Sequence, residues 1–119
     1  ENPILTDEII ITLGTDQIVI DNSEINISIL NGSSVKGVAG KLKDEMIRRG
    51  FNINKVGDAD REDYQNTIIK YSANSLKKAE IVKEYLSASY NNLEILEDPM
   101  LLTDIEIILG TKNDQEISI

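Results

Sequence analysis

Residues 25–51 read INISILNGSSVKGVAGKLKDEMIRRGF, and this stretch decides the fold. Apolar residues alternate over residues 25–30, which predicts a core strand, and a polar loop follows at residues 31–34. Residues 51–56 alternate again, which predicts a second strand. Between them we expect a helix over residues 35–49, because the apolar positions recur at helical spacing. Its expected buried stripe is Val35, Val38, Ala39, Leu42 and Met46.

Glycines and hydroxyls in this stretch suggest specific local roles. The loop at residues 31–34 is expected to supply a positive φ and an N-cap hydroxyl for the helix. Gly37 and Gly40 weaken helix propensity, so we expect them to let the helix approach the sheet closely. Gly50 is expected at the C′ position, where it ends the helix.

The same order of elements recurs further along the chain. Residues 67–71 predict a strand, a helix follows, and residues 93–96 and 105–110 predict two more strands. The expected fold class is α+β: a two-layer α/β sandwich with a mixed sheet and both helices on one face. A ferredoxin-like βαββαβ order with an extra C-terminal strand fits the right-handed crossover rule. The inner face of the second helix is expected to carry Leu76, Ala79, Val82, Leu86 and Tyr90.

Residues 1–24 are expected to form an N-terminal strand or hairpin extension, with residues 25–119 as the main domain. Strand-like runs lie at residues 9–13 and 18–20, separated by a turn. Residues 9–15 are similar to residues 105–111, and shared β-branched composition is the favoured explanation. The sharper hypothesis is that one strand replaces the other between molecules, which gives a homodimer through edge-strand pairing or exchange.

Composition excludes several classes of function. The chain has no Cys and no His, so Ser-His-Asp and Cys-His catalytic sites are impossible, and no metal or cofactor is expected. The formal net charge of −9 opposes binding to nucleic acid, anionic lipid and polyanionic wall polymers. No apolar run approaches the roughly 20 residues that span a bilayer, so we expect any membrane anchor to lie outside this chain.

The loop before the first helix is the candidate contact site. It comprises Asn31, Gly32, Ser33 and Ser34, with Lys36 nearby, and could hold a small anion, sugar hydroxyls or a partner at the helix start. Helix capping is the favoured structural explanation of the same residues. A phosphate-binding loop is excluded, because no Gly-Lys-Ser/Thr ending has the required spacing. The acidic residues 58–63 lack the pattern of a calcium loop and are expected to be solvated.

Taken in order, several segments resemble the C-terminal domain of LytR and related LytR-CpsA-Psr proteins of Gram-positive bacteria. The segments are ISILNGS at 27–33, GVA at 37–39, RRGF at 48–51, VGDA at 56–59, TIIKY at 67–71 and IILG at 107–110. The resemblance implies a non-catalytic, extracytoplasmic cell-envelope domain at the cell surface. It also implies tethering through an anchor outside this chain and contact with a protein partner or a cell-wall glycan. Any glycopolymer transferase activity belongs to a separate domain.

An alternative is a small-molecule-binding regulatory domain of the ACT type. Residues 37–42 (GVAGKL) and 49–53 (RGFNI) also resemble such domains. An ACT-like domain would dimerise in the cytoplasm and bind an amino acid at the loop before the first helix. Against this alternative, no Pro precedes Gly32, and the connection between the second and third strands is longer than a hairpin.

Overall fold

A computed structural model describes residues 20–111 of the chain. The expected N-terminal strands and the strand-exchange hypothesis therefore lie outside the described residues, apart from Ile20. Within the described range, no helix combines the length and the apolarity needed to cross a membrane.

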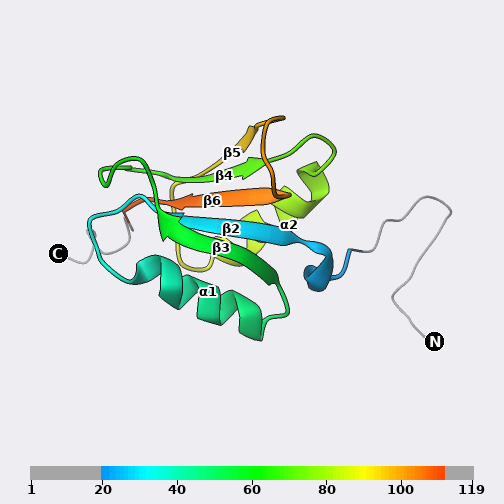
Figure 1. Cartoon of the computed structure of the whole chain (residues 1–119), viewed down its shortest axis with the longest axis horizontal. Helices are drawn as coiled ribbons and strands as arrows, with labels where there is room; N and C mark the ends of the chain where they lie inside the picture. The colour runs from blue at the N-terminus through cyan, green and yellow to red at the C-terminus, as the bar shows by residue number, and fades with distance from the viewer. Residues whose placement is uncertain (1–19, 112–119) are drawn as a thin grey trace, which may run out of the picture.

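The described elements form two strand–helix–strand units and a final strand (Figure 1). A short 3-10 helix, η2, precedes them at Asn22–Glu24. In chain order the remaining elements are β2 (Asn26–Asn31), α1 (Val38–Arg48), β3 (Asn52–Asp58), β4 (Thr67–Tyr71), α2 (Leu76–Leu86), β5 (Leu93–Glu97) and β6 (Ile105–Leu109). The α+β class expected from the sequence is confirmed.

Across residues 20–111 the strands form one mixed sheet in the order β3-β2-β6-β4-β5. The pairs β2–β3, β2–β6 and β4–β5 are parallel, and β4–β6 is antiparallel. The ferredoxin-like order is matched only roughly, because each strand–helix–strand unit joins direct neighbours instead of enclosing another strand. The extra strand β6 lies in the centre of the sheet between β2 and β4, and four of its five residues are buried.

Both helices pack against the same face of the sheet, as expected. The connection from β2 to β3 and the connection from β4 to β5 each lead toward an edge of the sheet, and these are opposite edges. Because β2 and β4 also run in opposite directions, two right-handed connections place α1 and α2 on the same face. The core lies between this face and the helices. Its side chains with no exposed surface include Ile27, Ile29, Met46, Ile69, Val82, Ile105 and Ile107.

The start of α1 differs from the sequence prediction. The helix begins at Val38, and Val35, which was expected in the buried stripe, is 57% exposed. Gly37 occupies the N-cap position with a φ of 85°, and no side chain caps the helix, so the predicted hydroxyl cap is wrong. The positive φ therefore belongs to Gly37, since Gly32 does not have one. Hydrogen bonds among Asn31, Ser33 and Val35 hold the preceding loop in a non-helical conformation. The helix therefore starts only after Gly37, which adopts a positive φ without strain.

Two other expectations about glycines and helix ends have different outcomes. A Cβ placed on Gly37 or Gly40 would meet nothing within 4 Å, so the predicted close approach to the sheet is wrong. Gly50 ends α1 as predicted, with a φ of 93°. The Gly50 N–H donates to the Ile47 carbonyl and the Phe51 N–H to the Met46 carbonyl, which is the Schellman pattern.

The inner face of α2 is largely as predicted. Ala79, Val82 and Leu86 are buried, and so is Tyr90, which lies beyond the helix end. Leu76 is 46% exposed, because as the first residue of α2 it projects past the edge of the core.

A candidate binding groove

The loop after β2 is closed by the side chain of Asn31. Its Oδ1 accepts hydrogen bonds from the Ser33 N–H at 3.0 Å and the Ser33 hydroxyl at 2.8 Å. Its Nδ2 donates to the Val35 carbonyl at 2.9 Å, and the Ser33 Oγ accepts from the Val35 N–H at 3.2 Å. The polar atoms of Asn31 and Ser33 are therefore used within the loop, in agreement with a turn-forming role.

The predicted contact residues do not all lie at the same surface. Ser33 and Ser34 line a groove, and Ser34 is exposed. Gly32 is buried beneath Tyr64, and Lys36 is exposed outside the groove lining. Of the five predicted residues, only the two serines thus reach the hollow described next.

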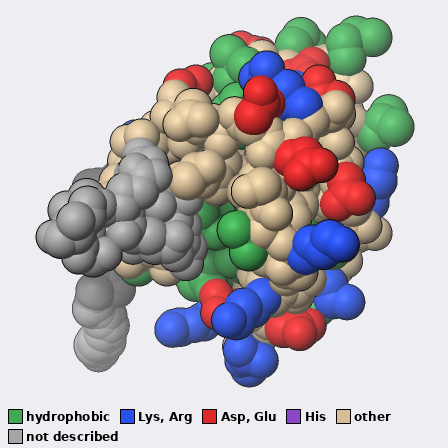
Figure 2. All heavy atoms as spheres, turned by 90° about the vertical axis from the view of Figure 1, so that its left-hand side faces the viewer, with side chains coloured by type: hydrophobic (Ala, Val, Ile, Leu, Met, Phe, Trp, Pro, Cys, Tyr) green, Lys and Arg blue, Asp and Glu red, His purple; other side chains and the backbone are tan. Residues whose placement is uncertain are grey.

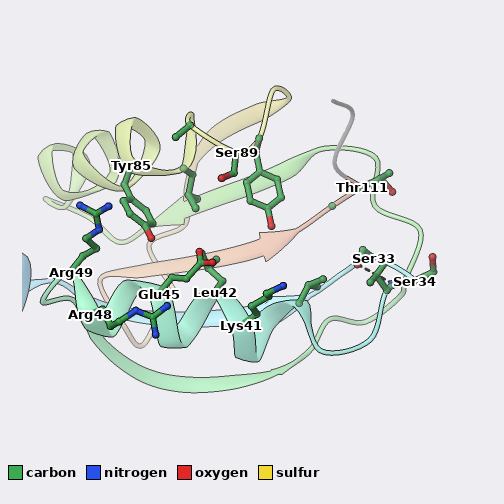
Figure 3. Close-up of a pocket in the computed structure, with 16 residues that line it drawn as sticks. Ser33, Ser34, Lys41, Leu42, Glu45, Arg48, Arg49, Tyr85, Ser89 and Thr111 are labelled. Carbon is green, nitrogen blue, oxygen red and sulfur yellow. Dashed lines mark hydrogen bonds between the residues drawn. The ribbon is translucent and has the colours of Figure 1, made fainter. Parts of the chain in front are cut away.

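The groove runs between α1 and α2 on the helical face and has a volume of about 640 Å³ (Figure 3). Volumes of this size are typical of sites that bind small molecules or peptide side chains. Val38 and Leu42 of α1 and Leu86 of α2 form its apolar floor, in which both leucines are buried, while hydroxyls and charged groups form the rim. Gly110 and Thr111, which follow β6, also line the groove, and Figure 3 shows Thr111 at the same end as Ser33 and Ser34.

One side of the rim is cationic. Lys41, Arg48 and Arg49 line the groove, together with Glu45. Figure 2 shows Lys and Arg side chains gathered low on the molecule, at the height of α1. Among residues 20–111 the ion pairs are Arg61–Asp63 and Lys78–Asp104, so the cations of the rim are not paired with carboxylates there.

The opposite wall carries Tyr85, Ser89 and Tyr90. Burial raises the pKa of the Tyr85 phenol, and the Glu45 carboxylate raises it further, while Arg49 and Arg48 act in the opposite direction. Figure 3 shows Tyr85 on α2 and the side chains of Glu45, Arg48 and Arg49 on the opposite side of the groove. The Tyr85 ring also packs against Phe51, with ring centroids 5.5 Å apart.

The acidic loop between β3 and β4 has a structural role. The Tyr64 hydroxyl donates to the Asp60 carboxylate at 2.7 Å, which lowers the pKa of Asp60 and raises that of Tyr64. Arg61 stacks over the Tyr64 ring with its guanidinium carbon 4.3 Å from the ring centre. In residues 20–111, no three acidic side chains come together as a metal site.

Sequence reasoning missed the groove, although a signal was present. Lys41, Glu45 and Arg48 follow one another at i, i+4 and i+7, so they share one face of α1. In sequence, such a row has the same pattern as the solvent-exposed face of any amphipathic helix. Only the position of α2 reveals that the row borders a hollow and faces a second wall.

The described residues form a small α+β domain with a groove between its two helices. Its sequence matches the model of the LytR_C family, described as LytR cell envelope-related transcriptional attenuator, over residues 24–112. The chain belongs to this family, which confirms the resemblance noted from the sequence and favours it over the ACT-like alternative. No curated protein matches the chain.

Two solved structures are similar in fold. The soluble domain of a conserved hypothetical secreted protein from Mycobacterium marinum, an Rv2700 ortholog, superimposes with a TM-score of 0.62 at 20% identity. The match covers 76% of this chain and 61% of that domain. The C-terminal domain of RV0431 gives a TM-score of 0.50 at 14% identity, covering 90% of both chains. At these identities, the likeness concerns the fold alone.

Proposed function

We propose that this chain is a non-catalytic interaction domain of a cell-envelope protein and that the groove between α1 and α2 is its contact surface. The observation that carries the proposal is a row of cations beside the apolar floor of a groove, with no ion-pair partner among residues 20–111, in a chain of the LytR_C family. Guanidinium and ammonium groups next to apolar surface are suited to hold a partner. They donate directional hydrogen bonds, and burial of the apolar surface beside them adds a favourable free energy of binding.

The residues of the groove are poorly suited to catalysis. Glu45 is the only carboxylate among the described lining residues, so the pair of carboxylates used in glycoside hydrolysis is not available there. The whole chain has no His or Cys to act as a base or nucleophile. Binding therefore accounts for this set of side chains better than a reaction does.

For its location we propose the outer side of the membrane of a Gram-positive bacterium, with an anchor elsewhere in the full-length protein. The family description, which refers to the cell envelope, supports this placement. The proposed partner is another envelope protein or a cell-wall glycan. Nucleic acid is not proposed, because the overall charge of −9 opposes it.

A photo-crosslinking experiment in living cells tests this proposal. A photoreactive amino acid replaces Ser34, which is exposed at the groove, in the full-length protein. The matched control carries it at Lys77, which is exposed on α2 but outside the groove lining. We expect adducts with an envelope protein or glycan from position 34 and fewer from position 77. Equal yields at both positions, or adducts only with cytoplasmic proteins, would contradict the proposal.

A further inference from the structure

We infer that the groove takes an extended peptide in which acidic and aliphatic side chains alternate. The inference rests on the proposed function of the groove as a contact surface and specifies the chemistry of the partner. It follows from the way α1 presents two neighbouring rows of side chains, one charged and one apolar.

The charged row consists of Lys41, Glu45 and Arg48, and all three are exposed. Seven residues of helix separate Lys41 from Arg48, which places their Cα atoms roughly 10 Å apart along the axis. Val38 and Leu42 of the same helix belong to the floor of the groove, and Figure 3 shows Leu42 beside Glu45. A ligand lying along α1 therefore meets cations on one side and aliphatic surface on the other.

An extended peptide has the matching geometry. Successive side chains point to opposite faces, and alternate side chains are about 7 Å apart. With carboxylates on one face, two of them lie within reach of the long side chains of Lys41 and Arg48, and Arg48 can bind a carboxylate with two parallel hydrogen bonds. The aliphatic side chains between them then point toward the apolar part of the lining, where Val35 is exposed and Val38 is half-buried. Tyr85 and Tyr90 enclose the peptide from the opposite wall of the groove.

The net charge of −9 does not prevent the binding of an acidic peptide. At physiological ionic strength, interactions between exposed charges fade beyond about 8 Å. Charges on distant parts of the surface are therefore screened, while Lys41, Arg48 and Arg49 act directly on a ligand in the groove.

Glu45 favours a peptide over a polyanion such as polyphosphate. Its carboxylate lies between the two cations of the row and repels a ligand that carries negative charge at every unit. A peptide instead offers backbone N–H groups, which can donate hydrogen bonds to the Glu45 carboxylate. The apolar floor also favours a peptide over polyphosphate, because phosphate units have no apolar side chains to bury there.

The test measures binding of a fluorescein-labelled peptide Asp-Val-Glu-Val-Asp-Val to the full chain by fluorescence anisotropy. Arg48→Glu reverses one charge of the groove, and Lys43→Glu makes the same change on α1 outside the groove lining. We expect Arg48→Glu to weaken binding at least about tenfold and Lys43→Glu to change it less than about threefold. A Ser-substituted peptide, Asp-Ser-Glu-Ser-Asp-Ser, should bind about tenfold more weakly because it cannot use the floor. Circular dichroism confirms that each variant is folded.

Three results would overturn the inference. These are no binding of the Val-containing peptide, equal losses in Arg48→Glu and Lys43→Glu, or tighter binding of inorganic polyphosphate than of the peptide. None of them contradicts the proposed function, because crosslinks from position 34 to an envelope partner would still identify the groove as a contact surface for another ligand.

Discussion

Tyr64 lies directly over Gly32: a Cβ atom on Gly32 would stand 2.5 Å from Tyr64 Cδ1. The same Cβ would be 2.9 Å from the Leu109 carbonyl oxygen. Backbone hydrogen bonds join these segments, from the Gly32 N–H to the Leu109 carbonyl at 2.8 Å and from the Tyr64 N–H to the Gly32 carbonyl at 3.0 Å. The ends of β2 and β6 and the loop after β3 are thus held together around one glycine.

Gly32→Ala should destabilise the domain by about 1–3 kcal/mol, since an extra carbon in a packed site forces neighbours to move. Here one of those neighbours is the Leu109 carbonyl, which cannot swing aside as a side chain can. Urea unfolding followed by circular dichroism measures the change. Adding Tyr64→Ala to Gly32→Ala should cost less than the two single losses combined, because one clash disappears. Strict additivity would argue that Tyr64 does not cover Gly32.

Gly37 and Gly40 should respond in opposite ways to replacement by Ala. Gly37 has a φ of 85°, so Gly37→Ala is expected to cost about 1 kcal/mol of backbone strain although the space around it is open. Gly40 lies inside α1 with open space around it, so Gly40→Ala should stabilise by about 0.5–1 kcal/mol. Thermal unfolding of both variants checks the signs. Stabilisation by both would mean that α1 begins before Val38.

Asn31→Ala should destabilise the loop after β2, because the side chain makes three hydrogen bonds within it. The expected loss is about 1–3 kcal/mol in the free energy of unfolding, measured in urea. Asn31→Asp is the matched variant, since it keeps the acceptor for Ser33 and removes the donor to Val35. Its loss should be smaller than that of Asn31→Ala. Equal losses would show that the acceptor contributes nothing.

The pKa of Tyr85 reports on the charges across the groove. Glu45→Gln should lower this pKa, because the carboxylate disfavours the phenolate, and Arg49→Gln should raise it. Carbon-13 NMR of the tyrosine ring measures both, with Tyr85→Phe assigning the signal. The stability linked to Tyr85 is present below the unfolded value of about 10 and is lost as pH rises through the folded pKa. Unchanged values in both variants would place these charges away from the phenol.

Much of the fold was predictable because local patterns and burial agree. Ile27 and Ile29 alternate with partly exposed or polar neighbours, and both are fully buried on the predicted face of the sheet. Gly50 ended α1 as expected, since Arg48 and Arg49 precede a residue that adopts positive φ without strain. These features depend on neighbours in sequence, which a sequence pattern records directly.

The start of α1 and the candidate site were harder to predict for physical reasons. Val35 continues the apolar spacing of α1, yet the side-chain bonds of Asn31 hold it in the loop, and local polar bonds compete with the helix. A hydroxyl of the loop at residues 31–34 was expected to cap the helix, but the Ser33 hydroxyl donates to Asn31 instead. A pattern of apolar positions contains no information about such competition.

The sequence by itself determined the family, the two strand–helix–strand units and the placement of both helices on one face, because periodicity, turn residues and crossover handedness specify these locally. Only the tertiary structure decided that β6 lies between the two units and that a groove opens between the helices. It also showed that the row of Lys41, Glu45 and Arg48 borders this groove. A charged face of a helix has the same pattern in water and beside a groove, and what lies opposite it depends on residues distant in the chain.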